Sequence, residues 1–393
     1  MKIAIVGAGL MGRLLALSLH RQAELEVTLF DKDTKLAHNS AAYAAAGLLT
    51  PLGESLHCEA NIVEMGFESL SLWPKLLASL DEHTFFQQTG AIMVSHEQDK
   101  GDYLRFVRHL QNNYPEQTLQ KLNRVQLNEL EPELGRSFNQ GLYLPQEGQI
   151  GNRRLLVALR KQLEQEGINW LSECLVTRIN HQENRAQISY IYCDKTKTQA
   201  FDLIIDCRGT GASTKYTSNY CAPLTDLRSV RGELFQLFAP DVHISRPIRL
   251  MHPRYQLYIA PKGKGFYVVG ATEIESSDEA NMTVRSAMEL LSAAYSVHSG
   301  FAEANIRQHI SQSRPAFNDN QPKIIVDGSL VQVNGLFRHG FLIAPVVLEQ
   351  VLTVVNNKVI GKDQVLPYNH LLTVQMLSEQ RVSKQTHKKE ANS

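Results

Sequence analysis

The sequence predicts an α/β fold that carries a second, α+β domain built on an antiparallel sheet. Three observations predict this class: a strand, glycine turn and helix at the N-terminus, a second glycine-rich turn after a buried strand, and a run of alternating strands beyond residue 230. The chain of 393 residues is also long for one domain, so two consecutive or intertwined domains are expected.

The first twelve residues, MKIAIVGAGLMG, organise the rest of the chain. Residues 2–6 form a short β-branched apolar strand, and residues 13–22 carry helical spacing after the turn. Gly7 permits a tight turn, Gly9 lets the backbone approach a pyrophosphate, and Gly12 allows close packing of the helix on the strand. The N-terminus of the helix then presents N–H groups to phosphate oxygens.

A second strand, residues 26–30, completes this unit. It ends at Asp31, near the distance expected for an acid that hydrogen-bonds ribose hydroxyls. Strand, turn, helix and second strand together predict a Rossmann-like unit that binds a dinucleotide. A glycine turn in an ordinary α/β sheet is the alternative.

A stretch of small residues, 39–51, follows this unit. Small side chains let the backbone approach something flat and large, so we expect a loop and a helix start that lie along a flavin ring. An alanine-rich helix packed in the core is the alternative. Residues 51–134 are then expected to be mostly helical, with one strand-like interruption at 90–95.

The middle of the chain is predicted to hold four elements: a strand at 141–144, a helix at 152–166, a strand at 171–180 and a buried strand at 201–206. Val176 is a candidate for backbone contact with an adenine. A second glycine-rich turn, residues 207–213, follows the buried strand. Two such turns far apart in sequence are typical of flavoproteins whose cofactor domain is discontinuous, whereas a loop that needs positive φ is the alternative.

Alternating strands dominate the next region and predict an antiparallel sheet with a covering helix. The expected strands are 230–237, 255–259, 265–270 and 330–333, and the helix is 284–296. A last apolar helix is expected from Phe341 to Asn356. The expected domains are a discontinuous cofactor-binding domain of residues 1–85, 141–225 and 310–375, a substrate-binding domain of residues 86–140 and 226–309, and a disordered tail at 378–393.

Composition limits the partners of the protein. Basic and acidic residues balance at 40 each, so no global field favours nucleic acid or a membrane surface. Five widely spaced cysteines without a CxxC pair suit reduced thiols, and no metal site is expected. The N-terminus begins a core strand without room for a signal peptide, and no apolar run is judged to approach a membrane span. We therefore expect a cytoplasmic protein that acts on small neutral or zwitterionic molecules.

Eight blocks spread over nearly the whole chain carry a family resemblance. They are GAGLMG at 7–12, AAAGLLTP at 44–51, DCRGTGA at 206–212, VRGELFQL at 230–237, HPRYQLYIAP at 252–261, VVGATEIE at 268–275, SRPAFNDNQP at 313–322 and NGLFRHGFLIAP at 334–345. In this order the blocks resemble the FAD-dependent amine oxidoreductases related to D-amino acid oxidase, and within them the glycine oxidases of thiamine biosynthesis. The resemblance implies an FAD enzyme that oxidises an amino acid.

The resemblance also implies roles for three residues. Oxidation of an amino acid by a flavin requires the α-hydrogen to face the flavin, so the protein supplies orientation and electrostatics. An arginine fork is a natural clamp for a carboxylate, and Arg314 matches the position of that arginine in the family. Tyr258, preferred over Tyr255, is expected to assist it, and Arg338 resembles an arginine near the flavin and the active site.

The helix that begins at Gly340 is expected to point its positive end at the flavin and to stabilise negative charge on the reduced ring. His339 departs from the family pattern and is either a pocket residue that titrates near neutral pH or a packed or solvated histidine. The full set expected to contact FAD is Gly7, Gly9, Leu10, Met11, Gly12, Asp31, Lys32, Ala46, Gly47, Leu48, Val176, Gly209, Gly340, Phe341 and Leu342.

The reaction implied is oxidation of glycine or another small amino acid to the imine, with O₂ reduced to H₂O₂, in thiazole formation. Three alternatives remain open at this point. One is a D-amino acid, sarcosine or proline-type dehydrogenase with another electron acceptor, and one is a non-catalytic flavin-binding partner of another enzyme. The third, an oxidase acting on modified tRNA, is disfavoured by the balanced charge. The resemblance is compatible with a homo-oligomer.

Overall fold

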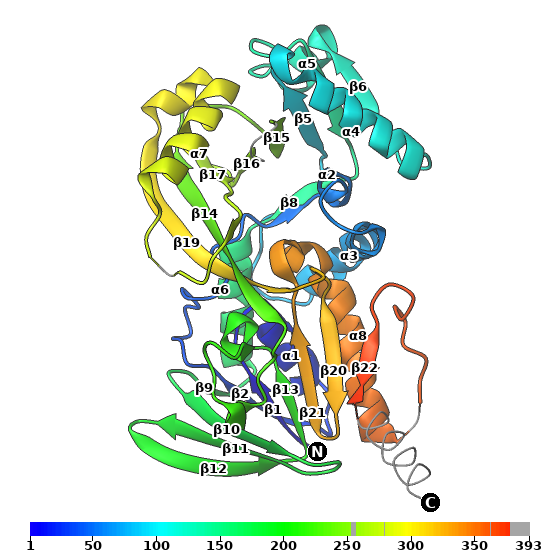
Figure 1. Cartoon of the computed structure of the whole chain (residues 1–393), viewed down its shortest axis with the longest axis vertical. Helices are drawn as coiled ribbons and strands as arrows, with labels where there is room; N and C mark the ends of the chain where they lie inside the picture. The colour runs from blue at the N-terminus through cyan, green and yellow to red at the C-terminus, as the bar shows by residue number, and fades with distance from the viewer. Residues whose placement is uncertain (253–256, 279, 362, 378–393) are drawn as a thin grey trace, which may run out of the picture.

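The computed structural model describes residues 1–252, 257–278, 280–361 and 363–377. Its first large sheet has seven strands in the order β22-β20-β21-β13-β1-β2-β9, all parallel to their neighbours except at the β20–β21 pair. The strands are β1 (Lys2–Val6), β2 (Glu26–Phe30), β9 (Asn169–Leu171), β13 (Leu203–Asp206), β20 (Lys323–Asp327), β21 (Leu330–Asn334) and β22 (Val374–Met376). The sheet therefore collects segments from both ends and the middle of the chain (Figure 1).

Both faces of this sheet are buried, which explains the near-continuous apolar run of its central strands. In β1, Ile3 and Ile5 join the core under the helices, whereas Ala4 and Val6 face the opposite core. The helices on the first face are α1 (Leu10–His20), α3 (Ala60–Ala78), α6 (Asn152–Gln165) and α8 (Gly340–Ile360). The opposite face is covered by a three-stranded antiparallel sheet of β10 (Leu175–His181), β11 (Ala186–Tyr192) and β12 (Lys195–Phe201).

Helix α8 is the longest helix among the described residues and lies beside the parallel sheet (Figure 1), where its buried side chains join the core. It packs against α1 and α3. The segment Phe337–Ile360 is long and apolar enough to cross a membrane, which corrects the sequence-based view that no run approaches that length. In this structure 72% of its most apolar window is buried inside the protein, as in the core helix of a globular domain.

The second large sheet is mostly antiparallel, in the order β18-β14-β17-β16-β15-β5-β7-β6, with β19 paired to the other side of β14. Its strands are β5 (Ala91–Ser95), β6 (Gln120–Asn123), β7 (Gln140–Leu144), β14 (Leu227–Phe238), β15 (Ile248–Met251), β16 (Leu257–Pro261), β17 (Phe266–Gly270), β18 (Ile274–Glu275) and β19 (Asn305–Phe317). Helices α4 (Lys100–Asn113), α5 (Arg124–Leu130) and α7 (Val284–Val297) pack on it. The predicted fold class, an α/β domain with an antiparallel α+β domain, is confirmed.

A small sheet joins the two halves of the molecule (Figure 1). It consists of β3 (Leu48–Leu49), β8 (Gly148–Ile150) and β4 (Phe86–Gln87), and it leads into the short helix α2 (Pro51–Glu54). Residues 39–44 form turns and bends and residues 45–46 form a loop, so the alternative of an alanine-rich core helix is wrong. Because these turns precede β3 and α2, the small-residue stretch lies where the two large sheets meet.

Several predicted elements differ from the structure. The single strand expected at 171–180 is two strands, β9 and β10, which belong to different sheets. The region expected to be mostly helical also contains β4 and β6, and the hairpin of β11 and β12 carried no predicted strand. β6 and β12 are polar and mostly exposed, so they show little apolar alternation, and β4 has only two residues. β11 does alternate, with Ala186, Ile188 and Tyr190 buried, and its pattern was missed.

The two large sheets give the proposed domain division its physical basis. We keep the division as a proposal, since β7 (140–144) and β19 (305–317) of the second sheet run across its boundaries at 141 and 310. The expected disordered tail, 378–393, and Tyr255 lie outside the described residues.

Candidate functional site

A cavity of about 770 Å³ lies between the carboxyl edge of the parallel strands and the second sheet. Its lining contains every residue predicted to bind cofactor or substrate except Gly12. Nucleotide-binding clefts of open α/β sheets occur at this edge of the strands. The cavity therefore joins the glycine turn after β1 to side chains from β16, β19 and the start of α8, which are far apart in sequence.

The glycine turn has the geometry that each glycine was predicted to supply. Gly7 has φ +101°, and its N–H donates to the carbonyl of Phe30 at 2.7 Å. A Cβ on Gly12 would lie 1.8 Å from the carbonyl oxygen of Gly7, so the helix packs directly on the turn. A Cβ on Gly9 would meet nothing within 4 Å, which leaves its backbone open to the cavity.

Asp31 holds the turn as well as lining the cavity. Its Oδ2 accepts a hydrogen bond from the N–H of Ala8, and its Oδ1 accepts one from the N–H of Asp33 at 2.7 Å. Burial raises the pKa of this carboxyl above its ordinary value, although the two backbone donors oppose that shift. The buried Arg13 donates to the carbonyl of Ala8 at 2.7 Å and so supports the same turn.

The loop before β3 and the second glycine turn also approach the cavity closely. Gly47 has φ +68°, and a Cβ there would lie 2.3 Å from the carbonyl oxygen of Ile150. Gly209 has φ +57° and follows Arg208, which binds both carboxylate oxygens of Asp206 at 2.8 Å. The second glycine-rich turn therefore does need a positive φ at Gly209, as the alternative interpretation expected. The same turn also lines the cavity.

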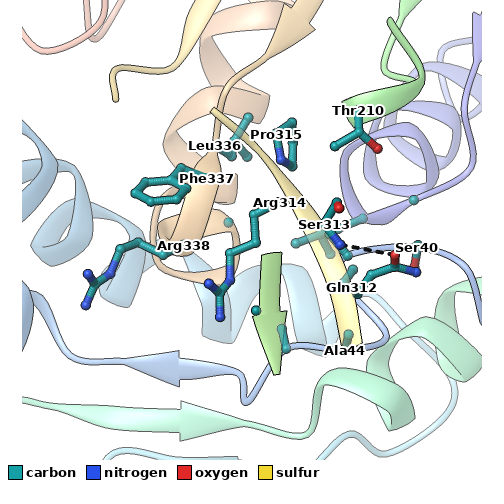
Figure 2. A pocket seen from close by; sticks show the side chains of 18 of the residues that line it. Ser40, Ala44, Thr210, Gln312, Ser313, Arg314, Pro315, Leu336, Phe337 and Arg338 are labelled. Atoms are coloured by element: carbon teal, nitrogen blue, oxygen red, sulfur yellow. Dashed lines mark hydrogen bonds between the residues drawn. The ribbon is translucent and has the colours of Figure 1, made fainter. Parts of the chain in front are cut away.

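Arg314 projects from β19 into the cavity, beside Arg338 and pointing in the same direction (Figure 2). Its guanidinium lies over Gly232, where a Cβ would meet Cζ at 2.2 Å. It donates to the carbonyl of Thr272 at 3.2 Å and makes no ion pair with another described residue. Burial lowers the pKa of Arg314, and the nearby Arg338 adds to that shift. The group is thus a desolvated cation suited to an anionic ligand.

Tyr258 lies on β16 next to this guanidinium. A Cβ on Gly270 would meet its Oη at 2.8 Å, so glycine at 270 leaves room for the ring. Burial raises the pKa of Tyr258, and Arg314 acts in the opposite direction. The phenol is therefore neutral at physiological pH and able to donate a hydrogen bond to the same ligand as Arg314.

Arg338 has carboxylates on both sides of its guanidinium. Nη2 lies 2.8 Å from Oε2 of Glu54, and Nη1 lies 2.8 Å from Oε2 of Glu273. Burial would lower the pKa of Arg338, but the two carboxylates raise it above its ordinary value. Arg338 therefore remains charged and is held by residues of α2 and the loop after β17.

Glu54 was not predicted from the sequence. This buried carboxylate of α2 pairs with Arg249 of β15 and with Arg338, and it lies 3.9 Å from His339 Nδ1. Burial would raise the pKa of Glu54, yet the two arginines hold it well below its usual range. Glu54 and Arg249 are 195 residues apart in sequence, so no local pattern reveals their pairing.

His339 lines the cavity but is a packed histidine. Its side chain is 3% exposed, and burial lowers its pKa to about 4 even though Glu54 opposes that shift. The suggestion that it titrates near neutral pH is therefore corrected. His57, also in the lining, has its pKa lowered by burial as well, so both imidazoles are neutral at pH 7.

Replacement of the buried Glu147 tests the electrostatics around α2. Glu147 accepts from the N–H of Gly53 at 2.7 Å, and burial raises its pKa from 4.5 to about 8. Because the folded state holds this proton more tightly than the unfolded state, the stabilisation is complete below pH 4.5 and is lost as the pH rises to about 8. One pKa unit corresponds to about 1.4 kcal/mol. The wild type should therefore lose on the order of 3–5 kcal/mol of unfolding free energy as the pH rises through this range, and Glu147→Gln should remove that pH-dependent loss.

The measurement is urea unfolding at pH 5.5 and pH 9 for the wild type, Glu147→Gln and the exposed control Glu24→Gln. The wild type and the control should lose stability between the two values, and Glu147→Gln should lose much less. If all three proteins lost the same free energy of unfolding between pH 5.5 and pH 9, the assignment of Glu147 as a buried neutral acid would be contradicted.

Within the described ranges, no group of three or more His, Cys, Asp or Glu side chains is placed to hold a metal ion. The cavity does fit FAD. An open glycine backbone at a helix N-terminus lines one part of it, and Gly47 and the guanidinium of Arg314 line it as well. A dinucleotide would lie between the glycine turn and Arg314, with its phosphates at the turn after β1.

Comparisons with known proteins agree with this fit. The family model described as FAD dependent oxidoreductase matches residues 2–349 of the chain. A protein of Rhizobium etli, named as a thiamine biosynthesis oxidoreductase, ThiO, is 32% identical over 351 residues, which cover 89% of this chain and 95% of the relative. A bifunctional protein ThiO/ThiG of Trichormus variabilis is 24% identical over 88% of this chain, and the match spans only 51% of that relative.

Solved structures share the fold. The crystal structure of glycine oxidase from Geobacillus kaustophilus has a TM-score of 0.79 at 21% identity, and the match covers 94% of this chain and 97% of that one. The crystal structure of an iminodiacetate oxidase from Chelativorans sp. BNC1 has a TM-score of 0.77 at 19% identity, with 95% and 99% covered.

Proposed function

Because the chain belongs to the family of FAD-dependent oxidoreductases, we propose that it oxidises glycine, or another small amino acid, at the carbon that bears the amine. The amino acid loses two electrons and two protons and becomes the imine. Water converts glycine's imine to glyoxylate and ammonia, and O₂ takes up the two electrons and two protons as H₂O₂. Similarity to ThiO proteins supports a place in thiamine biosynthesis, where the imine would be used to form the thiazole.

The observation that carries the proposal is that Arg314 faces the cavity without a carboxylate partner among the described residues. Of the four other arginines that line the cavity, Arg208, Arg249 and Arg338 each pair with a carboxylate of the protein, and Arg285 of α7 is exposed to solvent. Arg314 is partly buried, faces the cavity and lacks such a pair among the described residues. Two parallel hydrogen bonds from its fork, with a third from Tyr258, would hold a substrate carboxylate in one orientation.

In this arrangement the residues of the chain orient the substrate and exclude water. When bound, FAD supplies the acceptor for the two electrons. His57 and His339 line the cavity as neutral imidazoles at pH 7, so they add no charge to this part of the site. Gly340 at the start of α8 points a helix N-terminus at the cavity, where its partial positive charge would stabilise electron-rich groups.

The cofactor roles follow from the positions of the lining residues. We propose that the turn residues Gly7–Gly12 hold the pyrophosphate and that Asp31 and Lys32 lie at the ribose. Val176 would contact the adenine, and the residues of loops 46–48 and 340–342 and Gly209 would border the rest of the cofactor. A cytoplasmic, homo-oligomeric enzyme is part of the same proposal.

Oxygen consumption with glycine tests the function. The FAD-bound protein should consume one O₂ and release one H₂O₂ and one glyoxylate per glycine. Turnover of glycine with an artificial electron acceptor but not with O₂ would replace the oxidase by a dehydrogenase. Turnover of sarcosine or proline with none of glycine would keep the FAD enzyme and discard the substrate.

A further inference from the structure

The charged side chains near Arg314 form an alternating row. Arg249 pairs with Glu54, Glu54 pairs with Arg338, and Arg338 pairs with Glu273. All four residues line the cavity. The row contains two positive and two negative groups, so its net charge is zero, and Arg338 has a carboxylate at each of its two terminal nitrogens.

Other groups at this end of the cavity do not change that balance. His57 and His339 are neutral at pH 7, and Glu147 behind α2 is largely protonated there. Tyr258 is neutral as well. Among the described residues of this row and its neighbours, Arg314 thus remains as one cation without a carboxylate partner, which matches a ligand with one carboxylate.

Arg338 would otherwise be a second carboxylate site. Its guanidinium extends beside that of Arg314 and in the same direction (Figure 2), and the two cations are close enough for Arg338 to lower the pKa of Arg314. Two adjacent arginines in one cavity are suited to a dicarboxylate. The carboxylates of Glu54 and Glu273 occupy the donors that a second substrate carboxylate would use.

We propose that Glu273 and Glu54 are specificity-determining residues that restrict the site to monocarboxylates by occupying Arg338. The inference rests on the proposed function, in which Arg314 holds the carboxylate of a small amino acid. Glu54 is buried and also binds Arg249, whereas the side chain of Glu273 is 48% exposed and, among the described residues, forms an ion pair with Arg338 alone. Glu273 is therefore the residue that can be neutralised with least effect on folding.

Replacement of Glu273 by glutamine should open the second site. The row then carries a net charge of +1, and Nη1 of Arg338 loses its anionic partner. The row and Arg314 together then change from a charge of +1 to +2, which favours a dianion that bridges the two guanidinium groups. Glu273→Asp keeps the charge and should retain the wild-type selectivity.

The experiment measures dissociation constants of acetate and malonate for the FAD-bound protein from the change in flavin absorbance on titration. Glu273→Gln should bind malonate roughly tenfold or more tightly than the wild type does, and acetate within about threefold. The matched control is Glu275→Gln, since Glu275 is on the same segment and pairs with Arg228, which does not line the cavity. That control should bind both ligands like the wild type.

The double variant Glu273→Gln/Arg338→Met separates ligation by Arg338 from a general field effect. If the double variant loses the increase in malonate affinity seen in Glu273→Gln, the proposal is supported. A gain that persists without the Arg338 guanidinium, or no gain in Glu273→Gln, overturns it. Neither ligand is oxidised, so the result is independent of glycine turnover and failure of the proposed function is recognised separately by the oxygen assay.

Discussion

Arg314→Met is expected to lower kcat/KM for glycine by roughly 30- to 4,000-fold. Removal of one partner from a buried, hydrogen-bonded charge pair costs about 2–5 kcal/mol, and each 1.4 kcal/mol corresponds to about a tenfold change. Arg314 is desolvated, and among the described residues its guanidinium donates one hydrogen bond, to Thr272, so donors remain for a ligand. Steady-state oxygen consumption over a range of glycine concentrations measures the effect.

The variant should keep its FAD, because Arg314 lies on β19, outside the glycine turn. Arg285→Met is the matched control, since Arg285 also lines the cavity but is exposed on α7. Its kcat/KM should stay within about threefold of the wild type, as for other exposed charges. Unchanged kcat/KM in Arg314→Met with normal FAD content would contradict the role of Arg314 as the carboxylate clamp.

Gly12→Ala is expected to abolish stable FAD binding and to destabilise the fold by about 3 kcal/mol or more. The added Cβ would lie 1.8 Å from the carbonyl oxygen of Gly7. Because this oxygen belongs to the backbone and no side chain can move aside, the turn itself must shift. Gly7 in turn holds the end of β2 through its hydrogen bond to Phe30. Thermal unfolding of the apoprotein and the FAD content after gel filtration measure the two effects.

Gly9→Ala separates cofactor binding from folding. A Cβ on Gly9 meets nothing within 4 Å, and the residue has φ −71°, which alanine adopts without strain. The apoprotein should therefore unfold like the wild type, while the methyl group in the proposed pyrophosphate path weakens FAD binding. By contrast, if Gly12→Ala kept normal stability and FAD content, the claim that α1 packs directly on the turn at Gly12 would be contradicted.

The parts of the fold that the sequence predicts are those with strong local patterns. Strand β1, the glycine turn and α1 are adjacent in sequence, so apolar runs and glycine spacing reveal them directly. The central strands are apolar on both faces because helices and the β10–β12 sheet cover them. Each resemblance block contributes at least one residue to the cavity lining, Arg314 among them, because the blocks meet at the edge of the sheet.

The charged network was missed for a physical reason. Glu54, Arg249 and Glu273 look like surface charges in sequence, and their pairing depends on contacts between α2, β15 and the loop after β17. For the same reason Arg338 was assigned to the flavin and active site without its two partners. The split of the strand at 171–180 also follows from tertiary pairing. β9 joins the seven-stranded parallel sheet, whereas β10 joins the three-stranded antiparallel sheet with β11 and β12.

Anaerobic addition of glycine to the purified FAD-bound protein tests the central claim most directly. The visible absorbance of the flavin should bleach with glycine in the absence of O₂ and recover rapidly when air is admitted. Acetate, which has the carboxylate but no amine, should perturb the spectrum without bleaching it. A flavin that stays oxidised with glycine would contradict the proposed substrate, and one that bleaches but fails to recover in air would contradict the oxidase.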